Sequence, residues 1–387
     1  MPLRIPAYSE LDREQIEILN IPLQGKHLVV GPPGSGKTVM ALHRAQMFGL
    51  ANVHNLFLTH GKALSKYLEQ AVYDTPGVGG GAFTMHAWLH DFYRKYFNRS
   101  FPHIGEWGVD WMQVLRDVDA MLKGKDKVFR PYGHFRPYDH LVIDEGQDFA
   151  KELYLVAPSL AEHITVFADE NQRLWPDNAT IREISAHLGV DASCCGPHFI
   201  HKNHRNTRQI ALLAAEFYAG AVSGIPELPD RQGETPAVFE TRALGNQGRY
   251  IGNFARTYTD ASIGVICPDA ETVNELAKWI RKFAPATLVQ SQPAQFDFRT
   301  PGVMLVTYQT AKGLEFDSVF LVALDRLTYS ETVVWKMRLY VAIARARNSL
   351  YLMYSGDRPP FMDRIPSGLL DWHELPAPQV NASQGSQ

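Results

Sequence analysis

Short apolar runs alternate along the chain with longer stretches in which apolar and polar positions are mixed. The runs fall into two series. The first lies at 28–30, 55–59, 140–145 and 164–169, and the second at 236–240, 263–267, 303–307, 318–323 and 350–354. Short β-branched runs of this kind are typical of strands buried on both faces, and the stretches between them suit crossover helices. The pattern predicts an α/β fold with two parallel sheets.

Two series of strands predict two domains, and the length of 387 residues favours the same division, because single cores seldom grow beyond about 250–300 residues. We expect a first domain at 1–200 and a second at 201–356. Residues 87–137 are rich in aromatic and charged side chains and predict a short, mostly helical insertion in the first domain. Residues 357–387 end in a polar, proline-containing segment, which predicts a partly disordered tail.

A glycine-rich loop follows the first apolar run, with the sequence GPPGSGKT at 31–38. Its spacing matches the motif G-x-x-x-x-G-K-[ST], which holds nucleotide phosphates between a strand and a helix. The backbone N–H groups of Gly34, Ser35 and Gly36 can curl around a phosphate, and the helix start adds positive charge. Lys37 is expected to reach the β- and γ-phosphates, and Thr38 to hold Mg²⁺. The loop predicts a nucleotide but does not say what its hydrolysis drives.

Charged and polar side chains farther along fit around such a nucleotide. One apolar run ends in Asp144, which can hold Mg²⁺ beside the loop, and Glu145 can then deprotonate the attacking water. Gln172 lies three residues after another strand-ending aspartate and can contact the γ-phosphate. Arg205 and Arg345 lie in the second half, from which an arginine could reach across a cleft to the phosphates.

Composition narrows the class of protein. Hydrophobic residues make up 45% of the chain and charged residues 20%, with a formal net charge of −3. No apolar stretch approaches the ~20 residues of a membrane span, and the first residues lack the apolar core of a signal peptide. Cys194, Cys195 and Cys267 show no metal-ligand spacing, so we expect a reducing, cytoplasmic location. Any positive charge that binds nucleic acid must be gathered in a groove.

The order of the motifs resembles that of superfamily 1 DNA helicases of the UvrD/Rep type. The resemblance is carried by the blocks GPPGSGKT, DEGQD, ADENQ, NHRNT, TYQTAKGLEF and LYVAIARAR. Two further blocks, LFLTHGKAL at 56–64 and FTMHAW at 83–88, resemble those that contact a single strand in that family. The match extends from about residue 11 to residue 354, which is nearly the whole chain.

The resemblance implies two RecA-like domains with ATP and Mg²⁺ between them and single-stranded DNA bound across both. It repeats the roles given above to the loop, the acids, Gln172 and the two arginines. It also implies that Gln15 reads adenine, that His204 stacks on the base and that Glu315 lies near the ribose. The residues that it places against DNA are His60, Thr84, His86, Trp88, Trp175 and Thr307.

The chain departs from that family at several positions. His204 replaces a tyrosine, Gln309 a histidine and Ala344 a threonine, and His60 stands at the position of the aromatic in the first strand-contacting block. An imidazole can stack on a base but offers less area. The residues between NHRNT and TYQT are too few for the family's second inserted subdomain, and the first is reduced to the short segment at 87–137.

Two functions therefore remain open. One is a Mg²⁺-ATPase motor core that moves along single-stranded DNA, in the 3′-to-5′ direction that the family implies, and unwinds duplex poorly. The other is a non-motor NTPase that acts as a regulatory or sensor subunit beside a nuclease partner, for example in phage defence. The altered stacking positions and the missing subdomain favour the second function, whereas the complete set of hydrolysis residues fits both.

Overall fold

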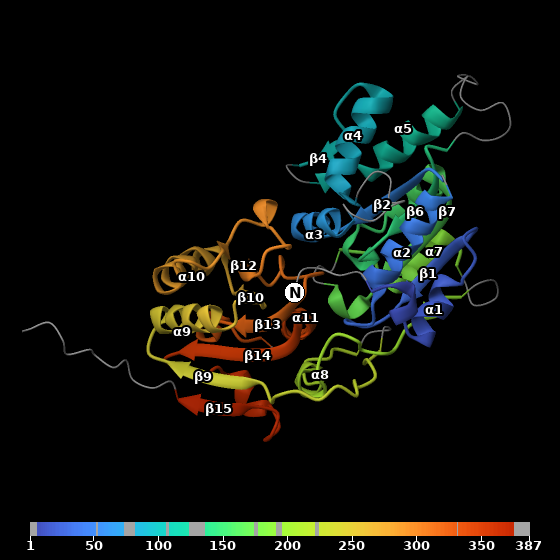
Figure 1. The fold of residues 1–387 in the computed structure, drawn as a ribbon. Coiled ribbons are helices and arrows are strands. Elements are labelled where there is room, and N and C mark those ends of the chain that lie inside the picture. Colours follow the sequence, from blue (N-terminus) through green and yellow to red (C-terminus); the bar gives the residue numbers. More distant parts are fainter. Residues whose placement is uncertain are drawn as a thin grey trace, which may run out of the picture.

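The computed structural model contains two large parallel sheets, one from each half of the chain, with helices packed on them (Figure 1). It describes residues 6–51, 53–72, 82–105, 108–123, 136–173, 177–190, 196–220, 224–330 and 332–374. The predicted α/β fold class, with two RecA-like domains, is confirmed. Within these residues, no helix has both the length and the apolar content needed to cross a bilayer.

The first sheet has the strand order β3-β2-β6-β7-β1-β8, and all neighbours are parallel. Its strands are β1 (Lys26–Val30), β2 (Asn55–Thr59), β3 (Ala82–Thr84), β6 (Tyr138–Ile143), β7 (Ala161–Ala168) and β8 (His198–Phe199). Val29 packs on one face with helices α1 (Arg13–Leu19), α2 (Lys37–Leu50) and α3 (Lys62–Val72). Its neighbours Leu28 and Val30 pack on the other face, under α6 (Leu153–Leu160) and α7 (Ile181–Leu188). This alternation, with both faces covered, explains why the strands read as continuous apolar runs.

The expected insertion contains helices α4 (Met85–Phe97) and α5 (Trp111–Lys123), with an antiparallel pair, β4 (His103–Ile104) and β5 (Gly108–Val109), between them. The helices bury Phe92, Trp111 and Val114 in the same core as Leu153 of α6. The segment is mostly helical, as predicted, and stands at one end of the first domain (Figure 1). Residues 124–135 of the expected insertion lie outside the described residues.

The second sheet has the strand order β11-β12-β10-β13-β14-β9-β15 and is also parallel throughout. Its strands are β9 (Ala237–Thr241), β10 (Ser262–Cys267), β11 (Val289–Gln290), β12 (Gly302–Thr307), β13 (Phe316–Leu321), β14 (Ala346–Ser355) and β15 (Asp371–Glu374). Helices α9 (Leu244–Thr257) and α10 (Ala270–Phe283) cover one face together with Val265 and Phe320. Helices α8 (Arg208–Ala215) and α11 (Val333–Ile343) cover the other face together with Ile266 and Leu321.

Part of the expected tail belongs to the second sheet. Strand β15 pairs with β9, and the 3₁₀ turn η6 (Pro360–Arg364) buries Phe361 and Met362 in the core below α11. Residues 375–387 lie outside the described residues. The other 3₁₀ turns are η1 (Tyr8–Glu10), η2 (Gly146–Asp148), η3 (Glu170–Gln172), η4 (Pro293–Gln295) and η5 (Leu324–Arg326).

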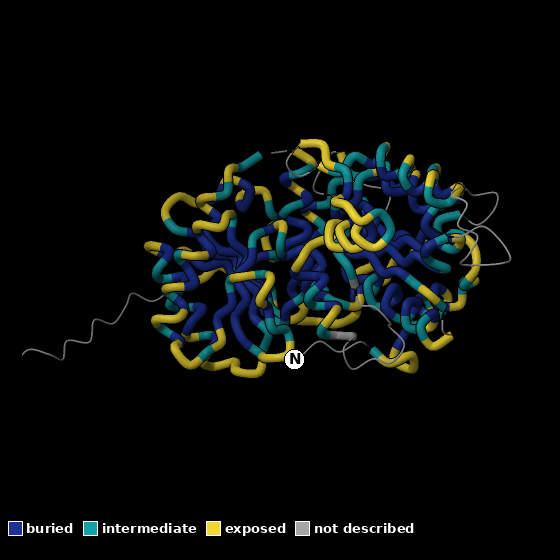
Figure 2. The backbone as a smooth tube through the Cα atoms, turned by 90° about the horizontal axis from the view of Figure 1, so that it is seen from above, coloured by how far each residue is buried: buried dark blue, intermediate teal, exposed yellow. Residues whose placement is uncertain are grey.

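Buried residues gather inside both domains, and exposed residues follow the outer helices and loops (Figure 2). Helix α3 connects the two interiors. Its Leu64 and Leu68 pack in the first domain, while Ala63 packs in the core of the second. A Cβ on Gly313 would lie 2.6 Å from Leu64 Cδ2. This close approach brings the turn after β12 against the first domain, beside the carboxyl ends of its strands, where open α/β sheets bind ligands.

Candidate active site

The phosphate loop joins the carboxyl end of β1 to the start of α2. Gly34 and Gly36 have φ angles of +81° and +90°, in the left-handed region that favours glycine. A Cβ on Gly36 would lie 2.4 Å from Gln15 Nε2, and one on Gly34 would lie 2.4 Å from Asn203 Oδ1. Gln15 also donates a hydrogen bond to the carbonyl of Ser35 at 3.3 Å. Helix α1 and the segment after β8 therefore hold the loop in shape.

The ammonium of Lys37 lies inside the curve of this loop. Nζ donates to the carbonyls of Gly31 and Pro32 at 2.8 and 2.9 Å and lies 3.6 Å from Asp169 Oδ2. The side chain is buried, so these oxygens offset the cost of removing its charge from water. The cation is thus held where a phosphate bound by the loop would meet it.

Thr38 and Asp144 form the candidate cation site. Thr38 Oγ1 donates to Asp144 Oδ2 at 2.8 Å, while Asp144 Oδ1 is buried with no hydrogen-bond partner among the described residues. Burial, together with the charge of Glu145, raises the pKa of Asp144 to about 7. A divalent cation would supply the missing partner and stabilise the ionised carboxylate, so these oxygens fit Mg²⁺.

The pKa of the next residue, Glu145, is shifted in the opposite direction to that of Asp144. Burial acts to raise its pKa, but the charges of Lys312 and Lys37 and a hydrogen bond from Gln147 outweigh burial and lower it. Gln147 Nε2 donates to Glu145 Oε2 at 2.6 Å. The backbone of Glu145 adopts a φ of +55°, in the left-handed region that few residues other than glycine occupy. The result is an ionised, oriented carboxylate on the wall of the cleft.

Arg345 lies just after α11 in the second domain and reaches the first. Its Nη2 donates to Gln172 Oε1 at 3.0 Å, and Gln172 Nε2 donates in turn to Asp169 Oδ2 at 2.7 Å. Its Nε and Nη1 donate to the carbonyls of Val341 and Leu314 at 2.8 and 3.2 Å. Burial lowers the pKa of Arg345 to about 9. Every guanidinium nitrogen is therefore oriented, and Gln172 bridges the two domains.

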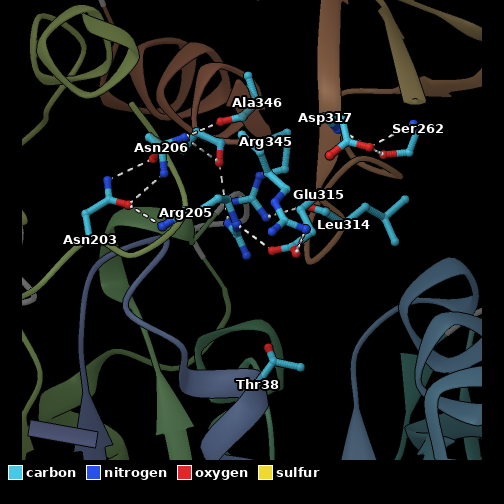
Figure 3. Close-up of polar contacts among 12 residues, drawn as sticks. Thr38, Asn203, Arg205, Asn206, Ser262, Leu314, Glu315, Asp317, Arg345 and Ala346 are labelled. Carbon is cyan, nitrogen blue, oxygen red and sulfur yellow. Dashed lines mark hydrogen bonds and ion pairs between the residues drawn. The ribbon is translucent and has the colours of Figure 1, made fainter. Parts of the chain in front are cut away.

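Arg205, from the segment between β8 and α8, lies close to Glu315 and Arg345, on the far side of the gap from Thr38 (Figure 3). Arg205 Nε donates to Glu315 Oε2 at 2.8 Å, and Arg347 Nη1 lies 3.5 Å from Glu315 Oε1. Burial acts to raise the pKa of Glu315, but the charges of Arg205 and Arg347 lower it overall. The two predicted residues Arg205 and Glu315 thus face the cleft as an ion pair.

Two cations of the site were not assigned from the sequence. Lys312, in the turn after β12, donates to Asp148 Oδ1 at 2.6 Å and also to the carbonyl of Gln172. Arg347 is the second partner of Glu315. Both residues lie inside blocks already identified, AKGLEF and ARAR. The sequence could therefore have suggested them, because each is a basic residue close to a residue that was assigned to the site.

Most predicted nucleotide residues line one cleft between the domains. They are Gln15, Gly34, Gly36, Lys37, Thr38, Glu145, Gln172, His204, Arg205, Glu315 and Arg345. Ser35 and Asp144 are fully buried beside it. Apolar lining comes from Pro6, Val39, Leu42 and Tyr67. The loop, the acids and the arginines, which lie far apart in sequence, therefore surround a single space.

His204 is held at the edge of this cleft. Its Nε2 lies 3.1 Å from Asp12 Oδ2, and its backbone N–H donates to the carbonyl of Gly34 at 2.9 Å. Asp12 is the N-cap of α1 and accepts a hydrogen bond from the backbone N–H of Gln15 at 2.8 Å. The charge of Asp12 therefore holds the imidazole close to the loop and the start of α1.

The residues expected to contact a strand lie mainly at the carboxyl ends of β2, β3 and β12. His60 follows β2, and Thr84 ends β3 and caps α4 by accepting from Ala87 N at 3.4 Å. His86 lies exposed in the first turn of α4. Thr307 ends β12, where its Oγ1 lies 3.2 Å from Thr310 Oγ1. We call His60, Thr84, His86 and Thr307 the strand-contacting surface.

Trp88 does not lie on that surface. It is 3% exposed, packs in the first core and donates from Nε1 to Tyr138 Oη at 3.0 Å. The reason is helical periodicity: Trp88, Leu89, Phe92 and Tyr93 share the buried face of α4, whereas His86 lies outside it. The expectation that Trp88 forms a wall of the groove is therefore wrong for this structure. Trp175, also expected there, lies outside the described residues.

Comparison with known proteins gives a match in the second domain. Residues 251–357 match the family model of the UvrD-like helicase C-terminal domain. A solved structure, the C-terminal domain of a possible DNA helicase from Lactobacillus plantarum WCFS1, shares 26% identity, with a TM-score of 0.35, and covers 43% of this chain and 97% of its own. No protein with a curated description matches the chain. The family match relates the chain to UvrD/Rep-like helicases and supports a helicase-type function in the broad sense.

Proposed function

We propose that this chain is a Mg²⁺-dependent ATPase of the UvrD/Rep helicase type that binds single-stranded DNA and couples hydrolysis to movement along it. The observation that carries the proposal is the cleft, where Lys37, Thr38 and Glu145 of the first domain face Arg205 and Arg345 of the second. Phosphoryl transfer depends on positioned charge around the transferred group, and such charge from two domains is available only when both are in place.

Binding of the phosphates is assigned to the loop. Its N–H groups and the Lys37 ammonium would exchange their contacts within the loop for phosphate oxygens. Thr38 and Asp144 would hold Mg²⁺, which supplies positive charge beside the phosphates. Gln15, His204 and the apolar residues Val39 and Leu42 lie where the base would enter.

Activation of water is assigned to Glu145. Its lowered pKa keeps it ionised near neutral pH, and Gln147 fixes the direction of its carboxylate. It can therefore accept the proton of a water that attacks the γ-phosphate. Asp144, one residue earlier, has a raised pKa and an unpartnered oxygen, which suits a cation ligand better than a base.

Charge from the second domain completes the site. Arg345 is already oriented toward Gln172, and Arg205 can share its guanidinium between Glu315 and a phosphate. Charge that develops during transfer would strengthen these contacts and draw the domains together. Loss of the γ-phosphate would weaken them, which gives two domain arrangements and a basis for stepwise movement. The 3′-to-5′ direction rests on family resemblance alone.

A second candidate function is a non-motor NTPase that acts as a sensor or regulatory subunit with a nuclease partner. The burial of Trp88 favours it, because one expected stacking platform for DNA is absent from the surface. ATP-driven displacement of a bound roadblock along single-stranded DNA would support the motor. Turnover that requires a protein partner and produces no movement would support the sensor.

The direct test is steady-state ATP hydrolysis by the purified chain, with and without Mg²⁺ and with and without oligo(dT). We expect turnover that requires Mg²⁺, rises with oligo(dT) and disappears in Lys37→Ala, measured below the unfolding temperature of the variant, because loss of the buried ammonium leaves Asp169 without its cation. Mg²⁺-independent turnover, or equal turnover by Lys37→Ala, would reject the site.

A further inference from the structure

His60 is the member of the strand-contacting surface that lies beside Asp148 of η2. It is the first residue after β2, and 47% of its side chain is exposed. Behind it, the ring of Phe149 lies edge-on, with centroids 6.1 Å apart and an interplanar angle of 88°. An exposed imidazole on a rigid aromatic support can stack on a nucleobase.

The other side of the same imidazole faces Asp148 in η2. His60 Nδ1 lies 3.7 Å from Asp148 Oδ2, which is just beyond hydrogen-bond distance. Asp148 is almost fully buried, and its Oδ2 has no hydrogen-bond partner among the described residues. An unpartnered buried carboxylate oxygen is costly, so a small movement of the ring toward it would be favourable.

Asp148 is also an anchor for the second domain. Its Oδ1 accepts the 2.6 Å hydrogen bond from Lys312, whose ammonium also donates to the carbonyl of Gln172. Gln172 in turn carries the contacts to Asp169 and Arg345. Asp148 thus faces His60 with Oδ2 and accepts the hydrogen bond from Lys312 of the second domain with Oδ1.

We propose that His60 is a positioning residue that reports a bound base to the ATP cleft through Asp148. This inference rests on the function proposed above and specifies how the strand regulates that same site. A base stacked on the exposed face moves the ring so that Nδ1–H donates to Asp148 Oδ2. The carboxylate is then fixed by two donors, which holds Lys312 and Gln172 in place and orients Arg345 for hydrolysis.

Two substitutions separate stacking from coupling. His60→Phe keeps a ring for the base but removes the Nδ1 donor. We expect it to bind oligo(dT) close to normally, while the stimulation of kcat by oligo(dT), measured against the variant's own rate without DNA, falls by about tenfold or more, the scale of a hydrogen bond to a charged group. His60→Gln keeps an N–H donor but loses the ring. It should bind oligo(dT) more weakly and keep much of the stimulation at saturating oligo(dT).

The matched control is His86→Phe, because His86 is an exposed histidine of the same surface in the first turn of α4, whereas His60 follows β2 and lies beside Asp148. It should retain normal stimulation. Normal stimulation of His60→Phe at saturating oligo(dT), or equal loss in His60→Phe and His86→Phe, would overturn the inference. These outcomes require a wild-type enzyme that hydrolyses ATP and responds to oligo(dT); failure of the wild type to do so would instead reject the proposed function.

Discussion

The two regions to which functions are proposed here, the nucleotide cleft and the strand-contacting surface, are built differently. In the nucleotide cleft, a continuous set of contacts runs from Lys37 to Asp169, through Gln172, to Arg345 in the other domain. On the strand-contacting surface, Thr84 is used to cap its own helix and His60 stops 3.7 Å short of Asp148. Lys37, Glu145 and Arg345 in the cleft are buried and oriented, whereas 47% of the His60 side chain is exposed.

The difference fits the roles proposed for the two regions. Phosphoryl transfer requires charges that are fixed before the reaction, because reorganisation at that moment would raise the barrier. Binding of a single strand tolerates looser geometry, since every base offers a face for stacking. Substitutions in the cleft should therefore act on turnover by orders of magnitude, and substitutions at the surface should act on affinity and on coupling.

The largest effect is expected at Arg345. Arg345→Met keeps buried volume but removes the guanidinium, and turnover should fall by about 10³–10⁵-fold, as for other arginines that stabilise phosphoryl transfer. Nucleotide affinity should change less, because the charge matters most in the transition state. Steady-state kinetics and nucleotide titration measure both quantities. Arg347→Met is the matched control, since that side chain is 44% exposed, and it should cost far less. Equal losses in the two variants would mean that Arg345 has no special role.

A smaller loss is expected when the base is removed. Glu145→Gln preserves shape and should reduce turnover by about 10²–10⁴-fold, the usual contribution of general base catalysis. Binding of ATP and Mg²⁺ should persist, because Lys37, Thr38 and Asp144 are unchanged. Turnover and equilibrium binding of a fluorescent ATP analogue test the two parts. If this variant binds ATP no better than Lys37→Ala does, Glu145 is not the base.

Trp88 and His86 should respond in opposite ways. Trp88→Ala removes a buried ring and should lower the free energy of unfolding by about 3–5 kcal/mol, as for other large-to-small core changes. The folded fraction should bind oligo(dT) normally. His86→Ala should leave stability nearly unchanged and weaken oligo(dT) binding. Urea unfolding measures the stability of both variants, and fluorescence anisotropy below the unfolding transition measures their affinity for oligo(dT). A loss of affinity in Trp88→Ala without a loss of stability would mean that Trp88 contacts the strand.

The smallest effect concerns pH and Mg²⁺. Because the pKa of Asp144 is raised from 3.8 to about 7, the folded chain retains a proton that the unfolded chain releases, so this group makes stability fall as pH rises from about 4 to about 7. Mg²⁺ binds the ionised form and should reverse that loss. The rise in unfolding temperature caused by Mg²⁺ should therefore be larger at pH 8 than at pH 6. Asp144→Asn should abolish this difference, and an equal rise at both pH values would argue against Asp144 as the ligand.

Local sequence determined much of the fold. Each apolar run predicted a strand, and the observed β2, β10 and β12 lie within a residue or two of the expected runs, because burial on both faces demands continuous apolar residues. The phosphate loop could also be predicted from the sequence, because Gly34 and Gly36 adopt positive φ angles that the local chain requires and that glycine accommodates. Strand β15 could not, because its four residues, DWHE, gain strand structure only by pairing with β9.

Tertiary structure decided how the predicted residues act. The adjacent acids Asp144 and Glu145 look equivalent in sequence, yet one has a raised and the other a lowered pKa, because Lys312 and Gln147 lie near Glu145. The exposure of Trp88 and His86 differs only because one face of α4 meets the core. Lys312 and Asp148 are 164 residues apart and meet only because the two domains pack together. The sequence by itself determined which chemical groups are present and which local backbone holds them. Their protonation, exposure and pairing depend on burial and on distances between segments remote in sequence, and only the folded chain sets these.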